Sequence, residues 1–415
     1  NHSEQDTMAY YAKFDFGFEF DNGMFLDGNV GIRYVETDVS AIGGIVYPDF
    51  NSTVPGGDLE EYCSADGPGG SIPSFCLEDP ATQESYRTWA DGSSVIIQDK
   101  YDYSNTLPSL NLRWGLNEDM FIRFGYSEAI SRPDFGLMKS NFPINFGGED
   151  STTGEWAGPD AQSAQVRIDP IEASNFDLSW EWYFADVGSI TVTGFYKDLD
   201  NYIVPGVSIR DFENNGETWD VQVSGSSNTP DDSGKIKGIE FAYQQLFDML
   251  PGLWGGLGVQ ANYTYIDSDG VPNTSFDNRS DSGSVEDNDG NIIGPLYDVS
   301  DMGLPGLSEN TVNLVLFWET DKISTRLAYN YRSEYTLTTR DVIDPYTPIV
   351  HGDTGQLDFS FFYTFNPAFK IGLQAVNLTD EVTETLSVYN DALDTAPRSF
   401  FRNDRRYSFI LRGQF

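Results

Sequence analysis

The sequence predicts an all-β fold, and more narrowly a transmembrane antiparallel β-barrel. Two observations lead to this prediction. Segments of about ten residues alternate apolar and polar side chains, as strands between lipid and a wet lumen must. The connections between these segments alternate between short and long without exception, and outer-membrane barrels keep short turns at one end and long loops at the other.

The alternation is clear from the first segment onward. Aromatic side chains recur at every second position from Phe14 to Phe20, and charged or small residues fall between them. The turn Asp21-Asn22-Gly23 then reverses the chain. We count about thirteen such strands, near residues 8–20, 24–37, 94–116, 119–131, 173–184, 188–204, 233–249, 253–267, 309–319, 322–336, 355–365, 368–379 and 404–415.

The connections are sorted by length. The short ones fall at Asp21-Asn22-Gly23, Asn117-Glu118, Ala185-Asp186-Val187, Pro251-Gly252, Asp321 and Asn366-Pro367. The long ones fall near 38–93, 132–172, 205–232, 268–308, 337–354 and 380–403, and we expect them to be extracellular. A soluble sandwich has no reason for such sorting.

The polar faces of the strands also exclude a sandwich, because their charges would be buried in a dry core. In a wide barrel they face water. We therefore expect a lumen-facing set of Arg33, Arg113, Arg123, Glu181, Arg326 and Arg412.

Composition narrows the class of protein further. The chain has 415 residues with 24 Lys and Arg against 65 Asp and Glu, and 14% of its residues are aromatic. Disordered acidic chains are poor in aromatics, so this chain folds. Its net charge of -41 would repel phosphate backbones, so nucleic acid is excluded as a partner. No run of eighteen apolar residues could form a transmembrane helix, and Asn1 begins no signal peptide.

The two cysteines, Cys63 and Cys76, lie in a long connection rich in Gly, Pro and Ser. A zinc site needs about four ligands, and neither a second Cys pair nor a nearby His is present. We predict a loop disulfide between them, and hence an oxidising compartment.

Several motifs resemble those of TonB-dependent receptors, especially the large group linked to carbohydrate uptake. The stretch LPSLNLRWGLNEDMFIRFGYSEAISRPD from Leu107 resembles the mid-barrel signature of that family. Further matches follow in the family's order: GIEFAYQ from Gly238, NYTYIDS from Asn262, GLSENTVNL from Gly306, LQAVNLTDE from Leu373 and the ending RRYSFILRGQF.

The resemblance implies a barrel of about 22 strands around a plug, and a TonB box that receives force from the TonB–ExbB–ExbD complex of the inner membrane. The sequence contains neither plug nor box, so we expect residues 1–415 to be the C-terminal part of such a barrel. About thirteen strands that begin on the outside cannot close by themselves, because single-chain barrels normally have an even number.

The resemblance also covers the last strand. Tyr407, Phe409, Leu411 and Phe415 alternate and end on an aromatic residue, as does the signal read by the barrel assembly machinery. An ordinary strand facing outer-membrane lipid would show the same pattern, and both roles can hold together.

Aromatic residues in or beside the long connections are candidates for ligand binding. Such rings stack on sugar faces while neighbouring Asp and Asn side chains bind hydroxyl groups. Packing of the loops, or a place in the aromatic girdle, is the more frequent role of any single one. The candidates are Trp156, Tyr202, Trp219, Tyr297, Tyr335 and Tyr346.

Metal and catalytic sites are not indicated. The acidic run from Glu286 to Asn291 departs from the calcium-binding loop pattern, because Ile292 stands where that loop requires Gly. His2 and His351 are the only histidines, and no Gly-x-Ser-x-Gly elbow occurs. We expect no cofactor and no enzymatic activity.

The resemblance therefore implies an outer-membrane receptor of a Gram-negative bacterium that imports a scarce nutrient. We expect an oligosaccharide as ligand. A siderophore, heme or cobalamin is the alternative, although the acidic loops disfavour an anionic ligand. A passive or adhesive barrel without transport is a further alternative.

Overall fold

The structure is a computed structural model, and it describes residues 2–54, 58–64, 72–137, 140–148, 155–163, 167–228, 234–269, 302–338, 341, 347–390 and 392–413. Three residues named above, Tyr297, Tyr346 and Phe415, lie outside these ranges, as does the acidic run at 286–291. No helix within the described ranges is long and apolar enough to cross a membrane.

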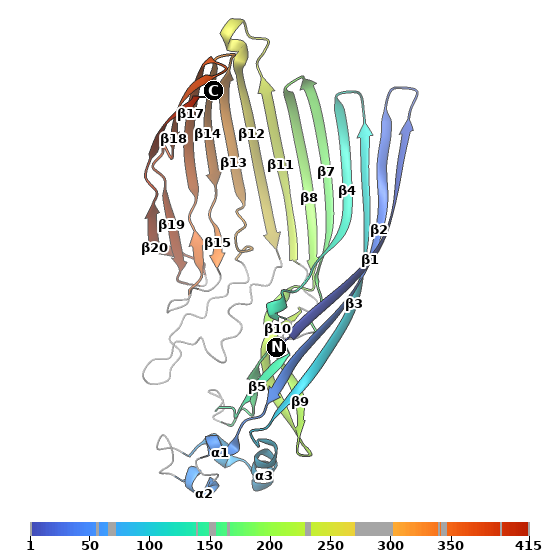
Figure 1. Cartoon of the computed structure of the whole chain (residues 1–415), viewed down its shortest axis with the longest axis vertical. Coiled ribbons are helices and arrows are strands. Elements are labelled where there is room, and N and C mark those ends of the chain that lie inside the picture. Colours follow the sequence, from blue (N-terminus) through green and yellow to red (C-terminus); the bar gives the residue numbers. More distant parts are fainter. Residues whose placement is uncertain are drawn as a thin grey trace.

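A curved antiparallel sheet forms the wall of the molecule (Figure 1). The sheet has 17 strands, of which four belong to long connections and the remaining thirteen form the wall. The wall strands are β1 (His2–Glu19), β2 (Phe25–Val46), β3 (Ser94–Gly115), β4 (Met120–Ser131), β7 (Ile171–Ala185), β8 (Gly188–Asp200), β11 (Gly234–Leu246), β12 (Leu257–Asp269), β13 (Asn310–Glu319), β14 (Ile323–Arg332), β17 (Thr354–Asn366), β18 (Phe369–Val376) and β21 (Arg406–Gly413). All expected strands are present in the expected order, which confirms the predicted fold.

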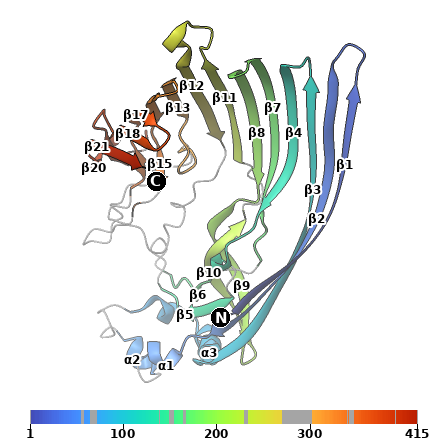
Figure 2. The same cartoon turned by 45° about the horizontal axis from the view of Figure 1, so that its top comes forward.

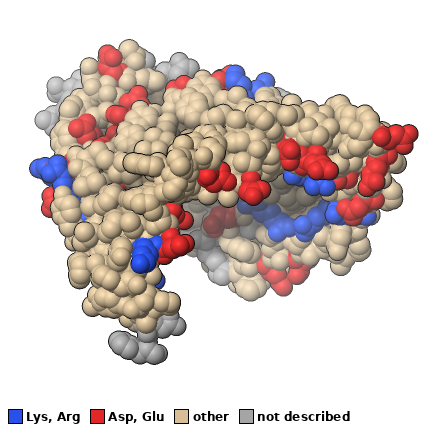
Figure 3. All heavy atoms as spheres, turned by 90° about the horizontal axis from the view of Figure 1, so that it is seen from above, with Lys and Arg blue, Asp and Glu red and all other residues tan. Residues whose placement is uncertain are grey.

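The register gives the wall two chemically different faces. Phe14 pairs with Val30, Val30 with Leu110, and these side chains belong to an exposed apolar face. The alternate positions carry the charges, such as the paired residues Asp27 and Arg113. Figure 3, viewed from the end with the short turns, shows basic and acidic side chains on the hollow side of the wall. The apolar face therefore contacts lipid and the charged face lines the lumen.

The turn between β11 and β12 is longer than the sequence predicted. The strands were expected to reach residue 249 and to resume at 253, but the turn runs from 247 to 256. Gly252 adopts a φ of 61° and begins the 3-10 helix η4 (Gly252–Gly256), while the Leu250 amide bonds the Phe247 carbonyl. Met249, Leu250 and Leu253 thus leave the strand.

The hairpin of β2 and β3 also differs from expectation. Its ladder continues without interruption to the pair Val46 and Ser94, whereas residues 38–46 were expected to be loop. On this extension Val39 and Ala41 are buried against Tyr101 and Tyr103. In this extension, side-chain packing on one face therefore takes the place of the lipid contact that supports the other half of the hairpin, nearer the short turns.

Three long connections fold together at the end of this extension, and we call this unit the loop body (Figures 1 and 2). Its elements pack around one shared aromatic core. Its elements are α1 (Phe50–Thr53), α2 (Leu59–Tyr62), η2 (Ser74–Leu77), α3 (Pro80–Trp89), β5 (Asn141–Asn145), β6 (Asp160–Gln162), β9 (Ile203–Asn214) and β10 (Glu217–Asn228). A further short 3-10 helix, η3 (Phe135–Leu137), follows β4.

The core of the loop body is built on α3. Asp79 caps the helix by accepting hydrogen bonds from the amides of Ala81 and Thr82. Tyr86 and Trp89 on its inner face are fully buried, and the Trp89 indole donates a 2.8 Å hydrogen bond to the Phe212 carbonyl. The predicted disulfide between Cys63 and Cys76 is present and ties the end of α2 to η2.

A second sheet of four strands continues the last part of the wall. It consists of β15 (Tyr335–Thr338), β16 (Ile349–His351), β19 (Val382–Val388) and β20 (Thr395–Arg402), in that order. These strands follow or precede β14, β17, β18 and β21 along the chain, so the same hairpins pass through both sheets. The hydrogen-bonded ladder of these hairpins is interrupted between the two sheets.

The two outer strands of the wall are not joined to each other. Among the described pairings, β1 pairs only with β2 and β21 only with β18. Because every successive pair is antiparallel, β1 and β21 run in the same direction, and a direct contact between them would be parallel.

We predict that Trp89→Ala loosens the loop body without opening the wall. Removing a fully buried indole costs about 3–5 kcal/mol through lost packing and the cavity left behind. Amide hydrogen exchange in residues 46–94 should accelerate, while exchange in β13 and β14 stays slow. Leu77→Ala is the matched control, because Leu77 is 71% exposed on the same connection. Unchanged protection in the Trp89 variant would contradict the role of this core.

Candidate functional site

A polar recess lies where the wall meets the four-stranded sheet, and we call it the mouth recess. It has a volume of about 490 Å³. It is lined by the ends of β13, β14 and β17, by β15 and β16, and by the segments around β19 and β21. The lining residues are Thr311, Asn313, Asn330, Tyr331, Arg332, Tyr335, His351, Thr354, Gln356, Asn377, Glu381, Thr383 and Asn403.

Three stacked side chains form one side of the recess. The Arg332 guanidinium lies 3.8 Å from the centre of the Tyr335 ring. The His351 imidazole stacks on Tyr335, with ring centres 4.8 Å apart and planes inclined by 15°. A guanidinium over an aromatic face is attractive, so Arg332 holds Tyr335 in place.

The segment before β13 fixes Arg332 in turn. The Ser308 hydroxyl accepts a 2.5 Å hydrogen bond from Arg332 Nε, and the Gly306 carbonyl accepts another from the guanidinium. Gly306 has a φ of 82°, and its amide bonds the Thr336 carbonyl of β15. The family-like motif that begins at Gly306 therefore has a structural task, which is to position the stacked side chains.

Side-chain amides occupy other parts of the recess. In the part of the chain that the structure describes, no hydrogen bond engages the amides of Asn313, Asn330 and Asn403. The Gln356 amide instead donates to the Asp358 carboxylate. Each free amide offers two donors and one acceptor oxygen. The recess thus combines one aromatic face with several uncommitted polar groups.

Asn377 organises the break between the two sheets. It adopts a φ of 58° and is buried, and its amide N–H donates to Asp358 at 2.9 Å. Its side-chain oxygen accepts from the Glu381 amide at 2.8 Å. This turn places Glu381 at the recess.

The same turn is fixed by an ion pair to the end of β20, the strand that pairs with β19. The hydrogen bond from Arg402 outweighs the opposing effect of desolvation and holds the pKa of the Asp380 carboxyl below its usual range. Arg405 lies 4.0 Å from the same carboxylate. Asp380 therefore stays ionised and joined to these arginines at neutral pH.

The described loop aromatics lie in three different places. Trp156 and Trp219 pack 5.7 Å apart in the core of the loop body, where each also contacts Tyr86 at 4.9 Å. Tyr202 lies half-buried before β9, and burial raises the pKa of its phenol. Tyr335 alone among these four lines the mouth recess. The candidates do not form one common site.

The expected lumen-facing charges lie on the inner register rows, and two of them pair with acids. Arg123 contacts Glu181 at 2.7 Å, and Tyr183 donates to the same carboxylate. Arg113 contacts Asp27 at 2.5 Å. The remaining three arginines occupy the same face. In the registers, Arg33 lies opposite Tyr11 and Leu107, Arg326 opposite Ser360, and Arg412 opposite Lys370. The two paired arginines, Arg113 and Arg123, are 40% and 45% exposed, as a wet lumen allows, whereas the Glu181 side chain is only 12% exposed.

The terminal aromatic residues lie on the outer face of β21. Tyr407 and Phe409 are each 69% exposed and Leu411 is 61% exposed. They share the row of Leu373 and Ala375 of β18. This is the surface that lipid contacts.

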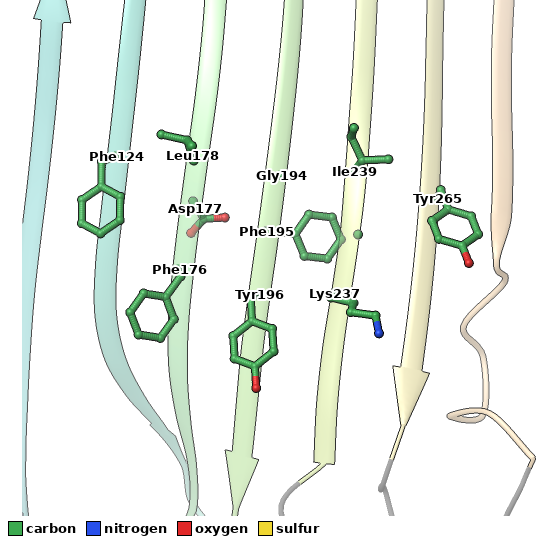
Figure 4. Close-up of a pocket in the computed structure, with 11 residues that line it drawn as sticks. Phe124, Phe176, Asp177, Leu178, Gly194, Phe195, Tyr196, Lys237, Ile239 and Tyr265 are labelled. Atoms are coloured by element: carbon green, nitrogen blue, oxygen red, sulfur yellow. The ribbon is translucent and has the colours of Figure 1, made fainter.

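A second depression of similar volume lies on the lipid-facing side of the wall (Figure 4). Leu178, Gly194 and Ile239 are register partners in one outer row, and the depression exists because Gly194 has no side chain there. Figure 4 shows Phe176, Phe124 and Tyr196 around it. Most of its lining is apolar, although Asp177 and Lys237 also contribute, so the mouth recess is the better candidate for a polar ligand.

Sequence reasoning missed Arg332, His351 and the free amides. The sequence does contain a signal for the amides, because Asn313, Asn330 and Gln356 fall at inner positions near strand ends. Their convergence could not be predicted, because it depends on a break in the ladder that alternation does not encode.

A curved sheet with an apolar outer face, a charged inner face and connections sorted by length defines a β-barrel protein of the outer membrane. The family model described as "TonB dependent receptor-like, beta-barrel" matches residues 1–378, and the chain belongs to this family. A comparison with curated protein sequences gives no match.

Solved structures of two receptors are similar to this chain. The ferric enterobactin receptor of Pseudomonas aeruginosa, solved with enterobactin, has a TM-score of 0.51 at 15% identity, with 99% of this chain and 54% of the receptor covered. The siderophore receptor of Acinetobacter baumannii has a TM-score of 0.48 at 16% identity, with 100% and 55% covered. The chain thus spans about half the length of these receptors.

We predict that Asn377→Ala destabilises the barrel more than Asn377→Gly. Both variants lose the side-chain hydrogen bonds, at about 1 kcal/mol each. Alanine adds left-handed backbone strain of about 1 kcal/mol, which glycine avoids. Urea unfolding midpoints should fall in the order wild type, glycine, alanine. Asn403→Ala is the control and should leave the midpoint unchanged, and equal midpoints for the two Asn377 variants would refute the backbone argument.

Proposed function

We propose that this protein is part of a receptor that imports a nutrient across the outer membrane and takes its ligand at the mouth recess. The observation that carries the proposal is the stacked set of Arg332, Tyr335 and His351, which lies beside several uncommitted side-chain amides. Family membership supports transport rather than catalysis. The TonB–ExbB–ExbD complex is the proposed energy source, and the barrel assembly machinery is the proposed reader of Tyr407, Phe409 and Leu411.

The long connections face the outside in this proposal, and the short turns face the periplasm. That orientation places the mouth recess and the loop body where an external ligand arrives. It also agrees with the sorting of turns and loops in outer-membrane barrels.

We propose that further strands close the barrel between β1 and β21. Unpaired backbone groups in lipid cost several kcal/mol each, so open edges cannot remain exposed. A direct seam between β1 and β21 would be parallel. An odd number of added strands restores an antiparallel closure, and a wider lumen then has room for a plug.

Within this function we propose an oligosaccharide as the ligand. Sugar rings stack on aromatic faces, and amides bind their hydroxyl groups as both donors and acceptors. Arg332 is poorly placed to bind an anionic ligand, because Ser308 and Gly306 already accept two of its hydrogen bonds.

A ferric siderophore is the second candidate. The solved receptors with the same fold are named as siderophore receptors, and Arg332 supplies one positive charge at the recess. The two candidates differ in charge, which makes them separable by experiment.

The orientation predicts which segments are reachable on whole cells. Epitope tags inserted between Ser64 and Ile72 should bind antibody without permeabilisation. Tags inserted at Asp21-Asn22-Gly23 should bind only after the outer membrane is opened. The reverse pattern would invert the proposed topology.

The ligand proposal predicts that Tyr335→Leu weakens oligosaccharide binding roughly tenfold, or by about 1.4 kcal/mol, because the ring that holds Arg332 and His351 at the recess is lost. Tyr329→Leu on the outer row of β14 is the matched control and should bind as wild type does. Calorimetry with a mixture of neutral oligosaccharides and with a ferric catecholate, each at low and high salt, separates the candidates. A neutral ligand binds independently of salt, whereas an anionic one weakens as salt rises. Binding of the catecholate alone would overturn the oligosaccharide proposal in favour of the siderophore.

A further inference from the structure

The turn between β11 and β12 differs chemically from the other turns at its end of the wall. The other turns carry charged or amide residues, such as Asp21, Asp186 and Asp321. This turn has one such residue, Asp248 near its start, and none from Met249 to Leu257. Its large side chains are nevertheless exposed, with Met249 at 65%, Leu253 at 66% and Trp254 at 65%.

The turn leans toward the lipid-facing side of the wall. Trp318 belongs to the outer row of β13, two positions beyond the exposed residue Leu316. Its indole donates a 2.8 Å hydrogen bond to the Leu253 carbonyl, which fixes the middle of the turn to that face. The apolar side chains therefore extend the surface that contacts lipid.

A glycine makes this close approach possible. A Cβ built on Gly256 would lie 1.8 Å from the Glu319 carbonyl oxygen of β13, so a larger residue would push the turn away. Gly252, with a φ of 61°, bends the chain at the other end of η4. The position of the turn is thus built into its backbone.

We propose that residues 249–254 form an interfacial anchor that inserts into the phospholipid leaflet at the short-turn end of the barrel. The continuity with the lipid-facing row selects lipid as the occupant. An indole and aliphatic side chains without charge suit the boundary between headgroups and acyl chains. The patch has only four large side chains, which is too small for a stable protein interface. In the proposed orientation this leaflet faces the periplasm.

Fluorescent labelling tests the anchor in the complete protein as its gene encodes it. The two cysteines of residues 1–415 are disulfide-bonded and do not compete for the label, and any cysteine elsewhere in the complete protein is replaced by serine. Leu253→Cys carries an environment-sensitive dye, and Asp321→Cys on the neighbouring turn is the matched control. The proteins are reconstituted in vesicles of phosphatidylethanolamine and phosphatidylglycerol.

The dye at position 253 should lose most of its emission to spin-labelled lipids and remain protected from iodide. The dye at position 321 should respond in the opposite way. Met249→Cys provides a second labelling site if the Leu253 variant does not assemble. Iodide quenching at 249 and 253 equal to that at 321 would overturn the anchor. Protection from both quenchers would also overturn it, since protein would then cover the turn.

Discussion

The need to satisfy every backbone hydrogen bond in lipid governs this structure. Inside a bilayer no water replaces a missing partner, so a chain of this kind can cross only as a continuous ladder of strands. Between neighbouring wall strands the antiparallel registers meet that condition, with irregularities only near the short turns of β7–β8 and β17–β18. The side chains then need only place apolar residues on the outer face and polar residues on the inner face. The acidic composition, the sparse apolar content and the long polar connections all become compatible with a membrane protein once the backbone is satisfied in this way.

Beyond the bilayer the constraint weakens, and the chain uses that freedom. Water can satisfy exposed backbone groups there, so the ladder breaks at Asn377 and at the segments that face it. The break lets side chains from inner rows turn toward one another, which creates the mouth recess. Elsewhere the connections build a small aromatic core around Tyr86 and Trp89 instead. The same chain therefore has a lipid-supported part and a part that must supply its own hydrophobic core.

How much the sequence could predict follows from this division. Where lipid imposes alternation, as from Phe14 to Phe20, the strand and its faces are readable, and the number and order of wall strands were predicted correctly. Where packing between distant segments decides the structure, the surroundings of a side chain were not predicted. Trp156 and Trp219 read as exposed loop aromatics because nothing local shows that α3 brings Tyr86 between them. Arg332 and His351 meet at Tyr335 only through contacts distant in sequence. Pro251 and Gly252 marked a turn, but its bounds depended on Trp318.

The hairpin of β2 and β3 sets the reach of the molecule. Each strand has 22 residues, which at roughly 3.3 Å per residue spans about 70 Å, against an apolar band of about 25 Å. A large part of the hairpin therefore extends beyond the bilayer, with the loop body at its tip. An antibody or a phage approaching a cell that displays this end would meet the disulfide-bonded tip before it met the mouth recess. Such agents would therefore act first on the tip, whereas the mouth recess lies at the ends of β13, β14 and β17, away from this hairpin in the sheet.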